Sequence, residues 1–93
     1  MPEDTANIRF GFDAADAAAD ELLLTAQSLF DSVSIMRQDI PVVTDDWTGR
    51  FREVFDVESA VHDLAMTRLA GELTLLSAQL RAMAIEAAAA WAP

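Results

Sequence analysis

The chain of 93 residues contains no cysteine, no lysine and no tyrosine, and only three glycines and three prolines. Without cysteine it has neither a disulfide framework nor a thiolate metal site. A many-stranded fold needs turn residues about every 8–12 positions, and glycine and proline are too scarce in this chain to form that many turns. Hydrophobic residues make up 53% of the chain, and alanine, the best helix former, recurs in runs. We therefore expect one all-α domain over residues 1–93.

The negative charge of the chain argues against nucleic acid and anionic membranes as partners. The net charge is −10, and all six basic residues are arginines that stand singly along the chain. With no basic patch to neutralise phosphates, nucleic acid and anionic membranes are poor partners. No run of about 18 uncharged apolar residues exists, so no stable membrane insertion is expected. Arginine without lysine in an alanine-rich chain is typical of GC-rich bacterial genomes, such as those of actinobacteria.

The first half of the chain carries a long apolar stripe with heptad spacing, which predicts a helix. Positions alternately four and three apart are all apolar: Ile8, Phe12, Ala15, Ala19, Leu22, Ala26, Leu29, Val33, Met36, Ile40, Val43 and Trp47. Asp13 is a suitable N-cap. Pro41 disfavours helical geometry at the residue before it. We therefore expect regular helix over about residues 13–40.

A second helix is expected over about residues 47–90, after a turn at 41–49. Asp45 and Asp46 place carboxylates where its exposed N–H groups begin. Its apolar residues form two heptad runs joined by a stutter, namely Val54, Val57, Val61 and Leu64, then Leu69, Leu73, Leu76, Leu80, Met83 and Ala87. Gly71 follows the stutter, either because the helices approach closely there or because the helix frays. Two helices with one short connection form an antiparallel hairpin.

The chain has more apolar residues than one hairpin can bury. Leu24, Phe30 and Ile35 in the first half, and Phe51 and Leu75 in the second, lie beside or off the two stripes. A monomer would expose them as a contiguous patch, which soluble monomers seldom tolerate. Two hairpins packed as a four-helix bundle would cover them. The expected core and dimer interface comprises Leu22, Leu29, Phe30, Val33, Met36, Phe55, Val61, Leu69, Leu76 and Leu80.

Nothing in the sequence indicates catalysis. His62 is the only histidine, and Glu58 one turn earlier is its expected surface partner. Acidic residues such as Asp16 and Asp20 recur at helical spacing, which is typical of a solvated face. There is no Ser/His/Asp constellation, Gly-rich phosphate loop or carboxylate pair with a supporting pocket. We expect a protein that is not an enzyme, with no catalytic residues, no metal and no cofactor.

The junction of the two helices carries the sequence Trp47-Thr48-Gly49. Glycine suits a tight reversal, and a tryptophan there can plug the open end of a bundle. With a Trp-x-Gly turn near the middle of a helical hairpin of this length, the chain resembles the WxG family of small type VII secretion proteins, relatives of the early secreted antigenic target. Phe51, Val54 and Phe55 follow the turn, where the family usually carries small or aromatic residues.

The resemblance implies a homo- or heterodimeric four-helix bundle that a membrane ATPase exports folded, without a cleaved signal peptide. The partners it implies are a second copy of this chain or a paralogous WxG hairpin, together with the type VII export ATPase. The location it implies is the cytoplasm before export and the outside of the cell afterwards. The acidic N-terminus, which has no cationic or apolar signal region, agrees with this route.

The chain departs from the family at its tail. The family's export signal combines the Trp-x-Gly turn of one partner with a Tyr-x-x-x-Asp/Glu motif after the second helix of the other. This chain has no tyrosine, and an acid four residues after Trp91 would fall beyond Pro93. The departure favours the signal-lacking partner of a heterodimer, while a homodimer with a different tail feature stays open.

Two residues are candidates for recognition by the export machinery. Trp47 is either a core plug or a plug that the machinery also reads. Trp91 is either a hydrophobic tail contact or a recognition residue. The alternative function for the whole chain is a cytoplasmic helical adaptor or assembly module that shares the hairpin and is not exported.

Overall fold

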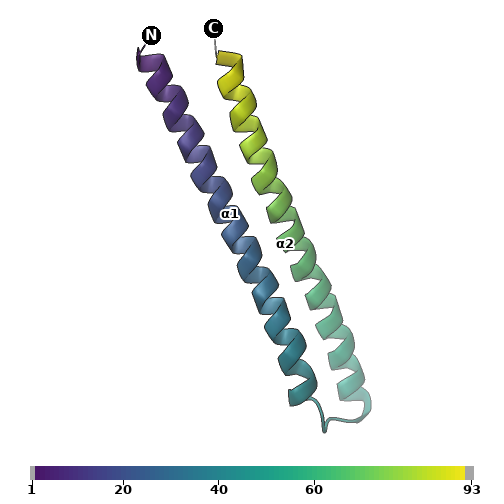
Figure 1. The fold of residues 1–93 in the computed structure, drawn as a ribbon. Helices are drawn as coiled ribbons and strands as arrows, with labels where there is room; N and C mark the ends of the chain where they lie inside the picture. The colour runs from purple at the N-terminus through teal and green to yellow at the C-terminus, as the bar shows by residue number, and fades with distance from the viewer. Residues whose placement is uncertain (1, 92–93) are drawn as a thin grey trace.

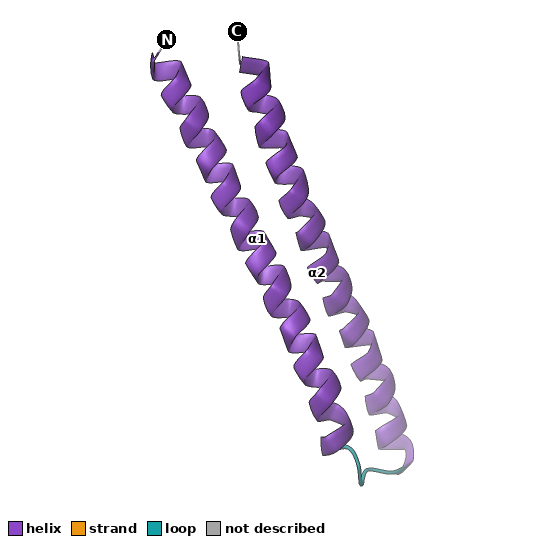
Figure 2. Ribbon diagram, in the orientation of Figure 1, coloured by secondary structure: helices purple, strands orange, loops and turns teal. Residues whose placement is uncertain are grey.

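The computed structural model describes the backbone of residues 2–91 and the side chains of Arg9 and residues 11–90. It contains two long helices, α1 (Pro2–Val43) and α2 (Gly49–Trp91), with no strand in the described part of the chain. The helices run antiparallel, so both ends of the chain lie at the same end of the molecule and the turn lies at the other (Figure 1; Figure 2). The rod measures 71 × 16 × 12 Å. The predicted all-α hairpin is confirmed.

Helix α1 begins earlier than predicted, at Pro2 and not near Asp13. Proline is well tolerated at the first helical position, because its missing N–H would have no partner there. Gly11 costs the helix only about 1 kcal/mol relative to alanine. Neither residue stops the helix, so a local N-cap signal at Asp13 does not fix where it starts.

Helix α1 also continues through Pro41, so the predicted end near Ile40 is wrong. Proline removes only its own hydrogen-bond donor, and the residues after it can still close a helical turn. The amide and the hydroxyl of Thr44 both donate to the Ile40 carbonyl, at 3.0 and 2.7 Å. Thr44 is buried, and the connection between the helices is confined to residues 44–48.

The two helices meet along a narrow seam of mostly small residues. Its fully buried members are Ala19, Ala26 and Val33 of α1, and Ala70 and Ser77 of α2. The Ser77 hydroxyl donates a hydrogen bond of 2.7 Å to the Ala19 carbonyl across the interface. One heptad further along each antiparallel helix, Ala26 lies opposite Ala70. Side chains of this size let two helix backbones approach closely, because the interaxial distance depends on the residues at the contact.

Helix α2 turns only part of its predicted apolar stripe toward α1, namely Leu73 and Leu80 of the second run. Each residue of the first run of that stripe is at least half exposed: Val54, Val57, Val61 and Leu64. A different row is buried or half-buried against α1, namely Phe55, Ser59, Asp63, Met66, Ala70, Leu73, Ser77, Leu80, Ala84 and Ala88. This row mixes alanine, serine and one aspartate with larger residues, so a search for large apolar residues does not find it.

Gly71 serves neither of the purposes expected from the sequence. It is exposed, and a Cβ built on it meets nothing within 4 Å, so Gly71 is not what lets the two helices approach each other. The helix also continues through it without a break. We therefore expect Gly71→Ala to stabilise the hairpin by up to about 1 kcal/mol, since alanine removes the helix cost of glycine. Urea denaturation followed by circular dichroism measures the change.

Gly49→Ala is the control for that substitution. Gly49 also has open space around it, but its φ is +81°, a left-handed conformation. A Cβ in this region costs about 1–2 kcal/mol, so this variant should lose stability. A loss of stability in Gly71→Ala as well would show that Gly71 has a packing role which the open space around it does not indicate.

Candidate functional site

The turn is built around an aromatic cluster of Trp47, Phe51 and Phe55. The Trp47 ring lies 5.4 Å from Phe51, tilted by 55°, and 5.1 Å from Phe55 in an edge-on arrangement at 74°. Trp47 is half-buried, whereas Phe51 is 69% exposed. The predicted plug therefore packs on the first two turns of α2 and presents an aromatic surface at the tip of the hairpin.

Arg52 holds the turn in place from inside the hairpin. Its guanidinium donates to the carbonyl oxygens of Thr44 and Trp47, the latter at 3.2 Å, and to the Asp56 carboxylate at 3.1–3.2 Å. The Trp47 amide donates to the same Thr44 carbonyl at 3.0 Å. A cation therefore satisfies the carbonyls just after the C-terminus of α1, where the helix dipole is negative. Sequence reasoning missed this role, because spacing alone does not show which carbonyls an arginine reaches.

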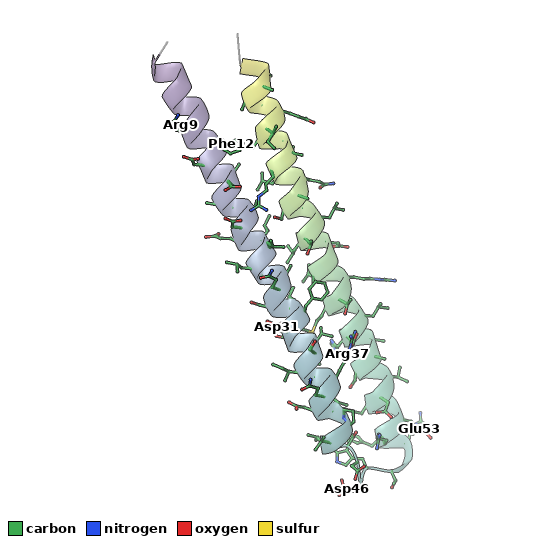
Figure 3. The ribbon with its side chains drawn as sticks, viewed as in Figure 1. Arg9, Phe12, Asp31, Arg37, Asp46 and Glu53 are labelled. Atoms are coloured by element: carbon green, nitrogen blue, oxygen red, sulfur yellow. The ribbon has the colours of Figure 1, made fainter. Side chains whose placement is uncertain are left out.

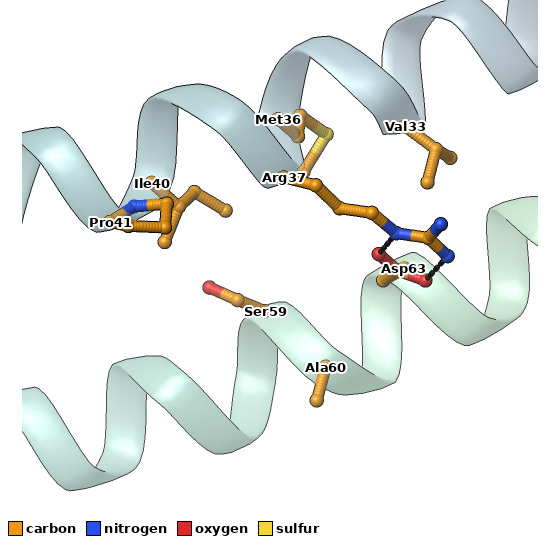
Figure 4. Close-up of a pocket in the computed structure, with 8 residues that line it drawn as sticks. All are labelled: Val33, Met36, Arg37, Ile40, Pro41, Ser59, Ala60 and Asp63. Atoms are coloured by element: carbon orange, nitrogen blue, oxygen red, sulfur yellow. Dashed lines mark hydrogen bonds and ion pairs between the residues drawn. The ribbon is translucent and has the colours of Figure 1, made fainter.

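One long side of the hairpin carries the ion pairs between the helices, and we call it the ion-pair edge. Arg37 of α1 forms a two-pronged pair with Asp63 of α2, with N–O distances of 2.6 and 2.7 Å. Figure 4 shows this pair beside Val33 and Met36. Nearer the chain ends, Arg81 of α2 reaches Asp16 at 3.1 Å and also Asp20. Figure 3 shows Arg37 reaching from α1 toward α2.

These pairs shift the titration of their members. The hydrogen bonds that Arg37 donates lower the pKa of Asp63, its positive charge adds to this, and partial desolvation opposes it. The same hydrogen bonds and the charge of Asp63 raise the pKa of Arg37. Because the pKa of Asp63 is lowered on folding, the pair stabilises the hairpin above the usual aspartate pKa of 3.8, and the contribution is lost as the pH falls. Both side chains are partly exposed, so solvent keeps that contribution small.

The opposite long side carries a row of large apolar side chains, and we call it the apolar edge. The α1 members follow one another at seven-residue spacing. On α2, Leu69, Leu76 and Met83 each come immediately before a residue that faces α1, so each points about 100° around the helix from the seam. Met36 and Val43 of this row line one groove near the turn together with Phe55 and His62 of α2, which shows that the α1 row lies beside α2. The row comprises Leu22, Leu29, Met36 and Val43 of α1, and Phe51, Leu69, Leu76 and Met83 of α2.

The exposure of this row shows that the hairpin alone does not cover it. Leu22, Leu29 and Met36 are half-buried beside the seam. On α2, Leu76 is 48% exposed and Met83 is 64% exposed. Large apolar side chains therefore lie in water beside a seam that is closed by alanine and serine.

The structure gathers most of the predicted interface residues on or beside this edge. Leu69 and Leu76 are exposed members of its row, and Leu22, Leu29 and Met36 are half-buried members. Phe55 and Leu80 are half-buried between the row and the seam. Val33 is buried in the seam itself. Phe30, one heptad before Arg37, lies on the ion-pair edge, and Val61 faces outward from α2. The side chain of Trp91 lies outside the described residues.

The described part of the chain has neither a metal site nor a membrane-spanning helix. Residues 2–91 hold no cluster of three or more histidine, cysteine, aspartate or glutamate residues that is suited to a metal ion. Neither helix, over the residues described, has a stretch apolar enough to cross a membrane. No family model, curated protein or solved structure matches the chain.

Proposed function

We propose that this chain is a small WxG-type type VII secretion protein that pairs its apolar edge with a second helical hairpin and is exported without a cleaved signal peptide. It acts by association and not by catalysis, and it resides in the cytoplasm before export. The observation that carries the proposal is the apolar edge, a row of large apolar residues left uncovered by a hairpin that closes through small ones.

Burial supports the pairing. Covering exposed apolar surface contributes about 25 cal/mol for each Å² removed from water. Leu69, Leu76 and Met83 keep about half or more of their surface exposed in the hairpin alone. A second hairpin laid along this edge would bury them in a four-helix bundle. Such a core also supplies the apolar burial that a chain of this size otherwise has difficulty providing.

The turn supports the export part of the proposal. The Trp47 ring packs against Phe51 and Phe55, and the Trp47 carbonyl accepts a hydrogen bond from Arg52. Gly49 permits the reversal through its positive φ. The Trp-x-Gly turn is therefore a preorganised surface at the tip of a rigid rod, and a preorganised surface loses little conformational entropy when a partner binds it.

Export is tested by immunoblotting washed cells and culture filtrate of the native host, with and without its type VII ATPase. The proposal expects the chain in the filtrate only when the ATPase is present. Retention in the cells of both strains, while a known substrate is exported, would favour the alternative of a cytoplasmic helical adaptor. The observation that favours this second candidate is that the 93 residues contain no tyrosine.

Trp47→Ala separates recognition from packing. Its secreted fraction should fall by at least about tenfold, the effect of losing roughly 1.4 kcal/mol of recognition energy, while affinity for the second hairpin changes less. Filtrate immunoblots and sedimentation of the purified complex provide the two readouts. Trp47→Phe is the conservative control, because it retains an aromatic ring against Phe55. Equal losses of export and association in Trp47→Ala would reduce the residue to a packing role.

A further inference from the structure

We infer that the apolar edge binds a helical chain whose own apolar row is bordered by arginine or lysine, and that a second copy of this chain is not its occupant. The inference rests on the pairing in the proposed function and specifies the chemistry of the partner. It follows from the positions of the charged residues: the fold leaves carboxylates on the apolar edge and places arginines elsewhere.

Carboxylates stand within the apolar edge on both helices. Glu58 and Glu72 of α2 occupy the same helical row as Leu69 and Leu76, at steps of three and four residues. Asp39 of α1 lines the groove between Met36 and Val43. All three acidic residues are exposed. None of them forms an ion pair with another described side chain.

The fold places the arginines elsewhere. Arg37 and Arg81 pair with aspartates on the ion-pair edge, and Arg52 holds the turn. Arg68 lies outside the edge, because Ala70 faces α1, Leu69 faces the apolar edge and Arg68 is a further 100° around the helix. The α2 row that holds Leu69 and Leu76 and the α1 row that holds Met36 and Val43 contain no arginine among the described residues, and the basic group in the groove near the turn is His62.

This distribution makes a second copy a poor occupant. Two copies would bring at least six carboxylates to one interface, and neither row of the edge supplies an arginine to pair with them. Like charges brought together on desolvation oppose association and select against wrong partners. Pairing would also double a net charge that is already −10. A partner whose apolar row has the same spacing would bury the same leucines. Arginine or lysine beside that row would form ion pairs with the carboxylates of the apolar edge.

The test uses the purified chain and a charge-reversed version of it as a stand-in for the basic partner. That version carries Asp39→Lys, Glu58→Lys and Glu72→Lys, all at exposed positions, so the hairpin should remain helical. Sedimentation at micromolar concentration should show the native chain at its monomer mass of 10.1 kDa in low salt. An equimolar mixture with the charge-reversed chain should form a mixed dimer, at least about tenfold tighter than either self-association and weaker in high salt.

The matched control places the same charge change away from the edge. Asp13→Lys, Asp31→Lys and Glu53→Lys alter three exposed residues outside the row that holds Leu69 and Leu76 and outside the row that holds Met36 and Val43. This control chain should give no mixed dimer beyond the self-association of the native chain. A control that binds the native chain equally well would show that net charge alone drives the pairing, and would overturn the assignment of the edge.

Two further outcomes separate this inference from the proposed function. A stable dimer of the native chain in low salt that Leu76→Asp disrupts would overturn the basic partner and leave pairing through the apolar edge intact. An equimolar mixture that stays monomeric at every salt concentration would overturn both the inference and the pairing on which it rests.

Discussion

Replacing Ala70 with leucine should destabilise the hairpin by about 1–3 kcal/mol, the usual cost of forcing extra methylenes into a packed interior. Ala70 is 0% exposed and lies opposite Ala26, which is also 0% exposed. A leucine there can fit only if the two backbones separate. Separation would strain the Ser77–Ala19 hydrogen bond one heptad away. Urea denaturation followed by circular dichroism, at one fixed chain concentration, measures the loss.

Ala78→Leu is the control for the small-residue seam. Ala78 is on the same helix and exposed, so its leucine variant should stay within about 0.5 kcal/mol of the native chain. Ala70→Leu and Ala78→Leu add the same atoms to the same helix. They differ only in that residue 70 faces the seam and residue 78 faces solvent. Equal stabilities for the two variants would contradict a seam that excludes large side chains.

Replacing Leu76 with aspartate should weaken association by at least about thirtyfold, the effect of losing a central contact worth 2 kcal/mol or more. The Leu76 side chain is 48% exposed in the hairpin, so a carboxylate there remains solvated while the chain is free. In the complex the same carboxylate would be buried among apolar side chains without a partner. Sedimentation with the charge-reversed chain gives the affinity, and circular dichroism checks that helicity is retained.

Leu75→Asp provides a close comparison. Leu75 precedes Leu76, is 58% exposed and faces outward, away from the apolar edge. Its aspartate variant should bind with nearly native affinity. If both variants lose binding to the same extent, the second chain covers the outward face of α2 as well, and the apolar edge as defined is too narrow.

The sequence predicted the inner face of α1 well. Three residues of the heptad stripe, Ala19, Ala26 and Val33, are its buried members. The prediction succeeded because one unbroken stripe runs the length of this helix and no competing row has the same spacing. The ends of α1 were predicted poorly, because Asp13 and Pro41 are local signals that a continuous packed helix overrides.

The inner face of α2 was not predictable in the same way. A polar residue, Ser77, occupies its centre because its hydroxyl finds the Ala19 carbonyl on the other helix. That partner is 58 residues away in the sequence, and no local pattern indicates it. The larger residues beside it, such as Leu69 and Leu76, look like core by composition and are exposed in the structure.

The candidate site was predicted in part for the same reasons. Gly49 was assigned to the reversal, and its φ of +81° bears this out. Arg52 was not singled out, since its hydrogen bonds go to backbone carbonyls that have no sequence signature. The division of the hairpin into an ion-pair edge and an apolar edge depends on how the two helices face each other, which neither helix specifies alone.

The order of the contacts along the rod also bears on how the chain folds. Arg52 meets Thr44 across 8 residues, Arg37 meets Asp63 across 26, and Ser77 meets Ala19 across 58. Once the turn has formed, each later contact closes only a short additional loop, so the entropy of loop closure is lost in small steps. The hairpin can therefore zip from its turn toward its ends, as chains rich in local contacts fold quickly. The tip that carries Trp47 is then complete first, and the end where the termini meet is the last to close and the first to open.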